Sequence, residues 1–134
     1  MEKSYQGSCH CGAVKFEAKV DLAKPTLRCN CSICFKSRAW LAGIGEGAFR
    51  FTAGEATLRD YQFGRERIHH LFCPVCGVKV CGRAAGAKPG EGFVAVSVAC
   101  LDGVSAEEFA AAPIQYVDGR HDEFKKPPAI ATYL

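Results

Sequence analysis

The chain has 134 residues, of which 49% are hydrophobic and 23% charged, and its formal net charge is +3. These values are ordinary for one soluble globular domain, which we expect to span residues 1–134. No apolar run approaches the roughly 20 residues that a membrane-spanning helix needs, and no apolar signal segment follows Met1, so we expect a cytoplasmic protein.

The first predicted strand follows a cysteine motif flanked by glycines. Cys9-His10-Cys11, the first cysteine motif, lies between Gly7 and Gly12, and these glycines free the backbone to wrap a metal ion. From Ala13 to Val20, apolar residues alternate with charged ones, a period of two that predicts a half-buried strand. The first motif therefore lies on a loop that enters a strand.

Further short strands are predicted around the other two cysteine motifs. The second motif is Cys29-Asn30-Cys31-Ser32-Ile33-Cys34, and the third is Cys73-Pro74-Val75-Cys76. The third motif is predicted as a hairpin turn, with a strand running into it and Val78 to Cys81 following it. The strands predicted between the second and third motifs are Ala39 to Ile44, Phe49 to Thr52, Thr57 to Phe63 and Ile68 to Phe72.

The C-terminal part of the chain contains the longest β-prone run and one helix signal. Phe93 to Ala99 is apolar at both odd and even positions, which predicts a central, buried strand. Ser105-Ala106-Glu107-Glu108 is a capping-box pattern, and it predicts a short helix that Pro113 stops. Ile114 to Val117 fits an edge strand. The predicted fold class is mainly β, with antiparallel sheets in a single zinc-stapled domain and one short helix.

Seven of the nine cysteines lie in the three motifs, at spacings typical of zinc sites. A Cys-x-Cys or Cys-x-x-Cys turn presents two sulfurs close enough to share one ion. Seven ligands divide naturally into four and three, although the spacing does not select which motifs combine. A four-thiolate site is closed and structural, whereas a three-ligand site keeps a position open for water or substrate. We therefore expect two zinc ions, one for folding and one for chemistry.

Two other interpretations of the cysteines fit less well. The odd cysteine count and the tight spacing within each motif disfavour disulfides and indicate a reducing compartment. Redox chemistry of the thioredoxin kind at Cys73 and Cys76 would need alternating strands and long helices, which the sequence does not show.

Zinc binding also changes the meaning of the net charge. Seven thiolates add seven negative charges and two zinc ions return four positive ones, so the formal +3 falls to about zero. Nucleic acid is therefore not an expected partner. Local positive charge remains beside the second and third motifs. These basic residues are either solvated surface charges or groups that stabilise thiolates and bind an anionic ligand. The residues concerned are Arg28, Lys36, Arg38, Arg65 and Arg67.

Three segments together carry a family resemblance. They are Gly7-Ser8-Cys9-His10-Cys11-Gly12-Ala13-Val14, the second cysteine motif, and His70-Leu71-Phe72-Cys73-Pro74-Val75-Cys76-Gly77. In this order and spacing they resemble the glutathione-dependent formaldehyde-activating enzyme family, which also includes centromere protein V. Cys100-Leu101-Asp102-Gly103 is similar to a later segment of that family. The resemblance covers about residues 7–118.

The resemblance implies a tent-like fold of antiparallel sheets with two zinc sites. By position it assigns the structural zinc to Cys9, Cys11, Cys73 and Cys76, and the catalytic zinc to Cys29, Cys31 and Cys34. The implied activity is the addition of glutathione to formaldehyde, a carbon-sulfur bond-forming step that is catalogued in the lyase direction. Glutathione or a related thiol, and formaldehyde or another small aldehyde, are the implied partners. The five basic residues named above are candidates to receive glutathione carboxylates.

Five further residues carry individual expectations. His69 and His70 alternate in a strand, one inward and one outward. His70 matches the family pattern and is a candidate for proton transfer, with a hydrogen-bonded core histidine as the alternative. His10 lies between two ligands and is expected to point away from the ion. Cys81 and Cys100 continue apolar strands, so we expect small buried hydrophobes rather than ligands.

A second function from a different class fits the same motifs. In this hypothesis the protein is a zinc-stapled module that binds a protein or chromatin partner without catalysis, as centromere protein V does. A fourth protein ligand such as Cys81 would then close the site at Cys29, Cys31 and Cys34. Open or closed coordination of that site distinguishes the two hypotheses.

Overall fold

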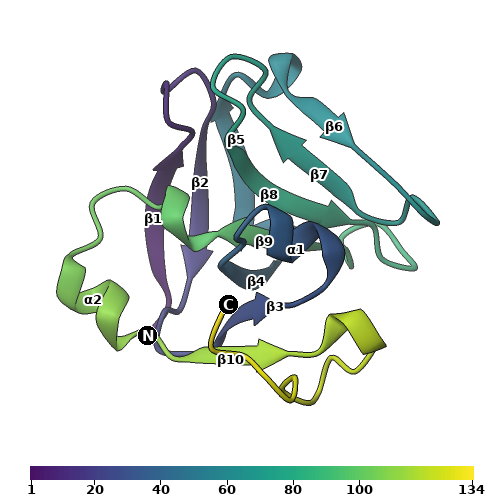
Figure 1. The fold of residues 1–134 in the computed structure, drawn as a ribbon. Helices are drawn as coiled ribbons and strands as arrows, with labels where there is room; N and C mark the ends of the chain where they lie inside the picture. Colours follow the sequence, from purple (N-terminus) through teal and green to yellow (C-terminus); the bar gives the residue numbers. More distant parts are fainter.

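Two β-sheets slope against each other in the computed structural model, which describes residues 1–134 (Figure 1). The smaller sheet has the order β1-β2-β5, with strands β1 (Lys3–Ser8), β2 (Lys15–Val20) and β5 (Phe49–Ala53). The larger sheet has the order β10-β3-β4-β9-β8-β7-β6. Its strands are β3 (Thr26–Cys29), β4 (Leu41–Gly45), β6 (Arg59–Tyr61), β7 (His69–Phe72), β8 (Lys79–Ala84), β9 (Phe93–Ser97) and β10 (Ile114–Val117).

All strand pairs are antiparallel except β10 with β3, which are parallel. The predicted mainly antiparallel β fold is therefore confirmed, and so is the prediction that residues 114–117 form an edge strand. No helix in the chain combines the length and the apolar character that crossing a membrane requires.

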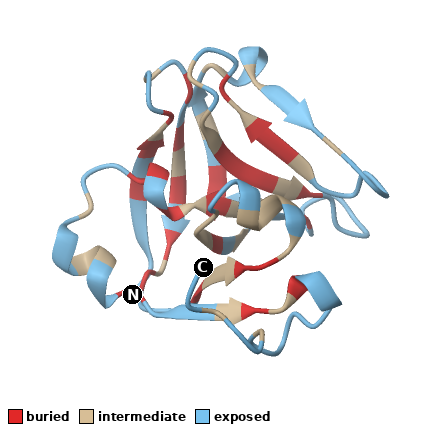
Figure 2. Cartoon of the chain, in the orientation of Figure 1, coloured by how far each residue is buried: buried red, intermediate tan, exposed pale blue.

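The hydrophobic core lies where the two sheets face each other (Figure 2). Phe16 of β2 is fully buried and stacks on Phe49 of β5, with ring centroids 5.1 Å apart. A Cβ atom on Gly7 of β1 would lie 2.1 Å from the Phe16 ring. Only glycine at this position therefore lets β1 pass so close to the ring. Val94 and Val96 of β9 are fully buried from the side of the larger sheet. The apolar side chains that alternate along residues 13–20 thus point into this core.

Strand β9 is central, as predicted, because it pairs with β4 on one side and β8 on the other. Only one of its faces is packed in the core, however. Phe93 remains 46% exposed, and Phe93 and Ala95 line a cavity on the opposite face. Both parities of this strand are apolar because one faces the core and the other faces a pocket.

The structure has two short helices, α1 (Ser32–Lys36) and α2 (Ala106–Ala111), so the prediction of a single helix is corrected. Helix α2 begins where the capping box places it, and the Ser105 Oγ accepts a hydrogen bond from the Glu108 N–H at 3.1 Å. Helix α1 begins after Cys31, without a side-chain cap, and so overlaps the end of the second cysteine motif. Five residues are too few for a helical period to be visible in the sequence.

Other boundaries also differ from the predicted ones. The sequence pattern does not predict strands β1 and β3, since each has few apolar residues. The predicted strand over residues 57–63 is reduced to Arg59–Tyr61, because Glu55–Thr57 forms a 3₁₀ turn.

Candidate active site and metal centres

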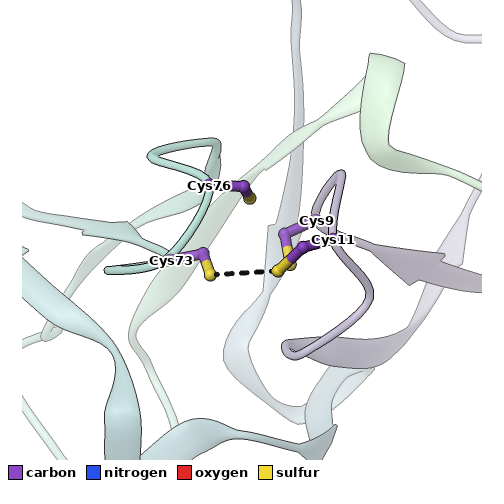
Figure 3. Close-up of side chains that lie close together, drawn as sticks. All are labelled: Cys9, Cys11, Cys73 and Cys76. Atoms are coloured by element: carbon purple, nitrogen blue, oxygen red, sulfur yellow. Dashed lines mark hydrogen bonds between the residues drawn. The ribbon is translucent and has the colours of Figure 1, made fainter.

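Four cysteines from two distant loops form one cluster, which we call the four-thiol cluster (Figure 3). Cys9 and Cys11 come from the β1–β2 loop, and Cys73 and Cys76 from the β7–β8 turn. Their four Sγ atoms lie within 4.8 Å of one another, and Cys11 Sγ is 3.7 Å from both Cys9 Sγ and Cys73 Sγ. A tetrahedral ion with Zn–S bonds of about 2.3 Å places its sulfurs about 3.8 Å apart. The cluster therefore fits zinc.

Backbone groups in these two loops favour thiolates. The Val14 N–H donates to Cys9 Sγ at 3.3 Å, and the Val75 N–H donates to Cys73 Sγ at 3.4 Å. Hydrogen bonds from the backbone N–H groups of Cys11 and Val78 lower the pKa of Cys76 to about 6. Gly77, with φ of 76°, lets the β7–β8 turn reverse directly after Cys76.

The three-thiol cluster consists of Cys29, Cys31 and Cys34, whose Sγ atoms also lie within 4.8 Å of one another. Cys29 ends β3, Cys31 precedes α1, and Cys34 lies within α1. No other Cys, His, Asp or Glu joins this cluster at that distance. The two clusters are the same groups of residues that the family resemblance implied.

The protonation of the three-thiol cluster also fits a cation. Hydrogen bonds from the Cys29 and Cys34 thiols lower the pKa of Cys31 to about 2, while hydrogen bonding to Cys29 and Cys31 raises the pKa of Cys34. The three sulfurs therefore compete for protons, because a thiolate at one of them disfavours ionisation of its neighbours. A divalent cation would let all three sulfurs ionise, and soft thiolates are the ligands that zinc accepts.

The segment after β10 packs directly on the three-thiol cluster. Asn30, 3% exposed, donates through Nδ2 to Asp118 Oδ1 at 2.8 Å, and its Oδ1 accepts from the Arg120 N–H at 2.9 Å. A Cβ atom on Gly119 would lie 2.4 Å from Cys29 Sγ. The C-terminal part of the chain thus forms one wall of the cluster.

A cavity of about 380 Å³ opens beside the three-thiol cluster. We call it the three-thiol cavity, because Cys29, Cys31 and Cys34 all line it. Two ionisable side chains from the larger sheet, His70 of β7 and Lys79 of β8, also line it. The β6–β7 turn covers part of it and contributes Arg65 and Arg67.

His70 and Lys79 form a hydrogen-bonded pair in this cavity. His70 is 6% exposed, and Lys79 Nζ lies 2.7 Å from His70 Nδ1. Burial, together with the positive charge of Lys79, lowers the pKa of His70. A neutral His70 accepts a hydrogen bond from the Lys79 ammonium at Nδ1 and carries its own proton at Nε2. His69 points outward to Asp60 Oδ2 at 2.6 Å, so the predicted alternation of the two histidines is confirmed.

Comparison with known proteins agrees with the motifs. The model of the glutathione-dependent formaldehyde-activating enzyme family matches residues 4–118. The chain belongs to this family. It is also similar to a Rhodobacter sphaeroides protein of known crystal structure, with 32% sequence identity and a TM-score of 0.68. That similarity covers 82% of this chain and 99% of the Rhodobacter chain. The resemblance inferred from the sequence is confirmed, and the match begins at residue 4 rather than about residue 7.

The basic residues proposed to receive carboxylates of the family's thiol lie in different places. Arg28 stacks over the Trp40 ring at 5.3 Å, and Arg38 Nη1 donates to the Tyr133 carbonyl at 2.7 Å. Lys36 is exposed at the end of α1. Only Arg65 and Arg67 line the three-thiol cavity, and neither forms an ion pair within the chain.

The two remaining cysteines are buried in the core and join neither cluster. Cys81 is 0% exposed and Cys100 is 7% exposed, which confirms their prediction as small buried hydrophobes. Burial raises the pKa of the Cys81 thiol to about 12, so it is a poor source of thiolate. His10 is exposed and belongs to neither cluster.

A second and larger cavity, of about 640 Å³, shares Leu41 and Lys79 with the three-thiol cavity. Its lining includes polar side chains of Arg38, Ser97 and Asp102. Sequence analysis did not identify Lys79, which now borders both cavities. The only sign of Lys79 in the sequence is its charge, which stands out in a largely apolar strand. The residues that alternate with it along β8 are buried.

Proposed function

We propose that this protein is a zinc-dependent carbon-sulfur lyase that joins glutathione or a related thiol to formaldehyde or another small aldehyde. The observation that carries the proposal is the three-thiol cluster, which faces a cavity and has no fourth protein ligand within reach. Three protein donors leave one position for a substrate, as in catalytic zinc sites. Membership of the formaldehyde-activating family supports the thiol and aldehyde classes.

In this proposal each cluster holds one zinc ion with its own role. Cys9, Cys11, Cys73 and Cys76 would hold a structural zinc that ties the β1–β2 loop to the β7–β8 turn. Cys29, Cys31 and Cys34 would hold the catalytic zinc. An ion bound there supplies Lewis acidity and stabilises a substrate thiolate.

The reaction moves one proton and forms one bond. The thiol loses its proton, its sulfur bonds to the carbonyl carbon as the C=O π bond breaks, and the carbonyl oxygen gains a proton. The Lys79 ammonium, beside the cluster, lowers the pKa of a thiol bound near it. Its Nζ also holds a proton for the developing alkoxide oxygen. His70 accepts from Lys79 at Nδ1 and so fixes the direction of the ammonium.

The adjoining cavity offers room for a polar thiol such as glutathione. Its volume of about 640 Å³ lies within the range of ligand pockets, about 300 to 1,000 Å³. Arg38 there suits a carboxylate, and Asp102 suits an ammonium group. A thiol in this cavity could reach the three-thiol cluster past Lys79, which borders both spaces.

The binding-module hypothesis required a fourth ligand such as Cys81 to close the three-thiol site. Cys81 lines the larger cavity instead and is not part of the cluster. This position favours the enzyme over the binding module.

The proposal is tested by NMR exchange between free and thiol-bound aldehyde, with zinc-loaded protein, a panel of thiols and a panel of aldehydes. We expect the wild type to accelerate exchange, and Cys31→Ser to return it to the spontaneous rate because one ligand is lost. Thr52→Ala, at an exposed position of β5 that lines neither cavity, should retain the acceleration. A wild type that carries two zinc equivalents and accelerates no thiol and aldehyde pair would overturn the proposal.

A further inference from the structure

The mouth of the three-thiol cavity is rimmed by exposed apolar side chains. Phe63, Ile68, Phe93 and Phe124, here called the apolar rim, are 44%, 41%, 46% and 59% exposed, and all four line the cavity. They come from three separate parts of the chain: the β6–β7 turn, the start of β9 and the segment after β10. Exposed large apolar groups that converge on one opening mark a binding site rather than scattered surface residues.

One wall of the rim is held in place by aromatic stacking. The Phe63 ring stacks on His70 with centroids 5.5 Å apart and an interplanar angle of 17°. Phe63 also stacks on Tyr61, with centroids 5.7 Å apart, and the Tyr61 and His70 centroids are 6.3 Å apart, so the three rings pack against one another. Because His70 is buried and bonded to Lys79, this stack connects the apolar mouth to the polar floor of the cavity. The wall is therefore preorganised for a ligand.

Formaldehyde and glutathione do not account for this lining. Formaldehyde has two non-hydrogen atoms and leaves a cavity of about 380 Å³ largely empty. Glutathione carries two carboxylates, an ammonium group and two peptide units, and the nine apolar side chains among the 19 lining residues, the three thiols not counted, offer these groups no hydrogen bonds. The adjoining cavity of about 640 Å³ supplies polar partners for such a thiol. The three-thiol cavity also has cationic groups, Arg65, Arg67 and Lys79, but its apolar rim is left for an apolar group.

We infer that the aldehyde substrate of this site carries an apolar chain or aromatic ring, which the apolar rim binds while the carbonyl group faces Lys79 and the three-thiol cluster. This inference rests on the proposed function and names the class of its second substrate. The balance of the reaction is unchanged: the carbon-sulfur bond forms, the C=O π bond breaks, and the thiol proton ends on the carbonyl oxygen.

The test compares kcat/KM for formaldehyde, acetaldehyde, butanal, hexanal and benzaldehyde with one thiol and the zinc-loaded protein. Each methylene group that the rim buries should raise kcat/KM by roughly fourfold, so hexanal should exceed acetaldehyde by more than about tenfold. Ile68→Ser should flatten this chain-length dependence. Ile130→Ser is the matched control, because Ile130 is 66% exposed and does not line the cavity, and it should keep both the activity and its chain-length dependence.

Phe124→Ser, from a different segment, gives the same readout if Ile68→Ser fails to fold. A wild type that turns over formaldehyde fastest, without a gain from longer chains, would overturn the inference and leave the proposed function standing. A wild type that accelerates no aldehyde would overturn both. A second copy of the chain on the rim, detected by sedimentation as a dimer that Ile68→Asp dissociates, would also overturn the inference.

Discussion

At the scale of single residues, the pair of His70 and Lys79 shows how burial sets the protonation of the candidate site. The imidazole is almost completely buried beside an ammonium group, so its positive form is doubly disfavoured. A neutral imidazole can accept a hydrogen bond from the Lys79 ammonium, whereas an imidazolium would repel the ammonium. The orientation of Lys79 therefore depends on the protonation of His70.

This arrangement predicts a pH dependence of stability. The pKa of His70 lies below 6.5 in the folded protein and near 6.5 in the unfolded chain. Between these two values the unfolded state binds more protons, so the stabilisation present above pH 6.5 is lost as the pH falls toward the folded-state pKa. We expect the free energy of unfolding to fall more steeply between about pH 7.5 and pH 5.5 in wild type than in His70→Gln.

Urea unfolding of the zinc-loaded proteins at several pH values measures this slope. His69→Gln is the control, because His69 is exposed to solvent at 42% of its side chain and pairs with Asp60. The His69→Gln protein should keep the wild-type slope of unfolding free energy against pH, whereas His70→Gln should flatten it. Equal slopes for wild type and His70→Gln would show that the buried imidazole is not the group responsible.

The residues of the candidate site were predictable to different degrees. Cysteine spacing identified all seven thiols, because metal ligands from one turn must lie close together in the sequence. His70 was identified through its place in the family motif. Lys79, Asn30 and Gly119 were not, since their roles come from pairings across the sheet and from long-range packing. Local patterns carry no information on such contacts.

At the scale of elements, the second cysteine motif is shaped by a segment almost 90 residues later in the chain. Strand β10 pairs in parallel with β3, and the turn after it is bonded to Asn30 with a sequence separation of 88 residues. The sequence predicted β10 as an edge strand, but not its partner or direction. Strand pairing depends on which edge is free once the other strands are in place, which a strand's own sequence does not specify.

Gly119 gives a test of this packing. Alanine there would bring a methyl group 2.4 Å from Cys29 Sγ and 3.0 Å from the Phe124 ring, so the segment or the cluster must move. We expect Gly119→Ala to destabilise the protein by about 1 to 3 kcal/mol, as overpacking does, and to weaken metal binding at the three-thiol cluster. Thermal melts and a zinc count measure the two effects.

Gly43→Ala is the matched control, because nothing lies within 4 Å of the added methyl group on β4. It should retain the wild-type zinc content, with a melting temperature close to that of wild type. If Gly119→Ala behaves like Gly43→Ala, the C-terminal segment is not a wall of the cluster.

At the scale of the whole molecule, the two clusters differ in how much of the fold they connect. The four-thiol cluster joins residues 9 and 11 to residues 73 and 76, and so links the smaller sheet to the larger one. The three-thiol cluster lies within residues 29–34. Closing a long loop removes more conformational entropy from the unfolded chain than closing a short one. Metal at the four-thiol cluster should therefore contribute more to global stability.

This difference gives opposite predictions for one substitution in each cluster. Cys76→Ser should lower the melting temperature strongly or prevent folding, because structural zinc in small domains contributes apparent free energies on the order of 10 kcal/mol. Cys31→Ser should lose one zinc equivalent and leave the melting temperature within a few degrees of wild type, since its cluster closes only a local turn. Calorimetric melts with a zinc count on each purified protein make the comparison. Equal destabilisation by both substitutions, or a Cys76→Ser protein that melts like wild type, would contradict the division into a structural and a catalytic site.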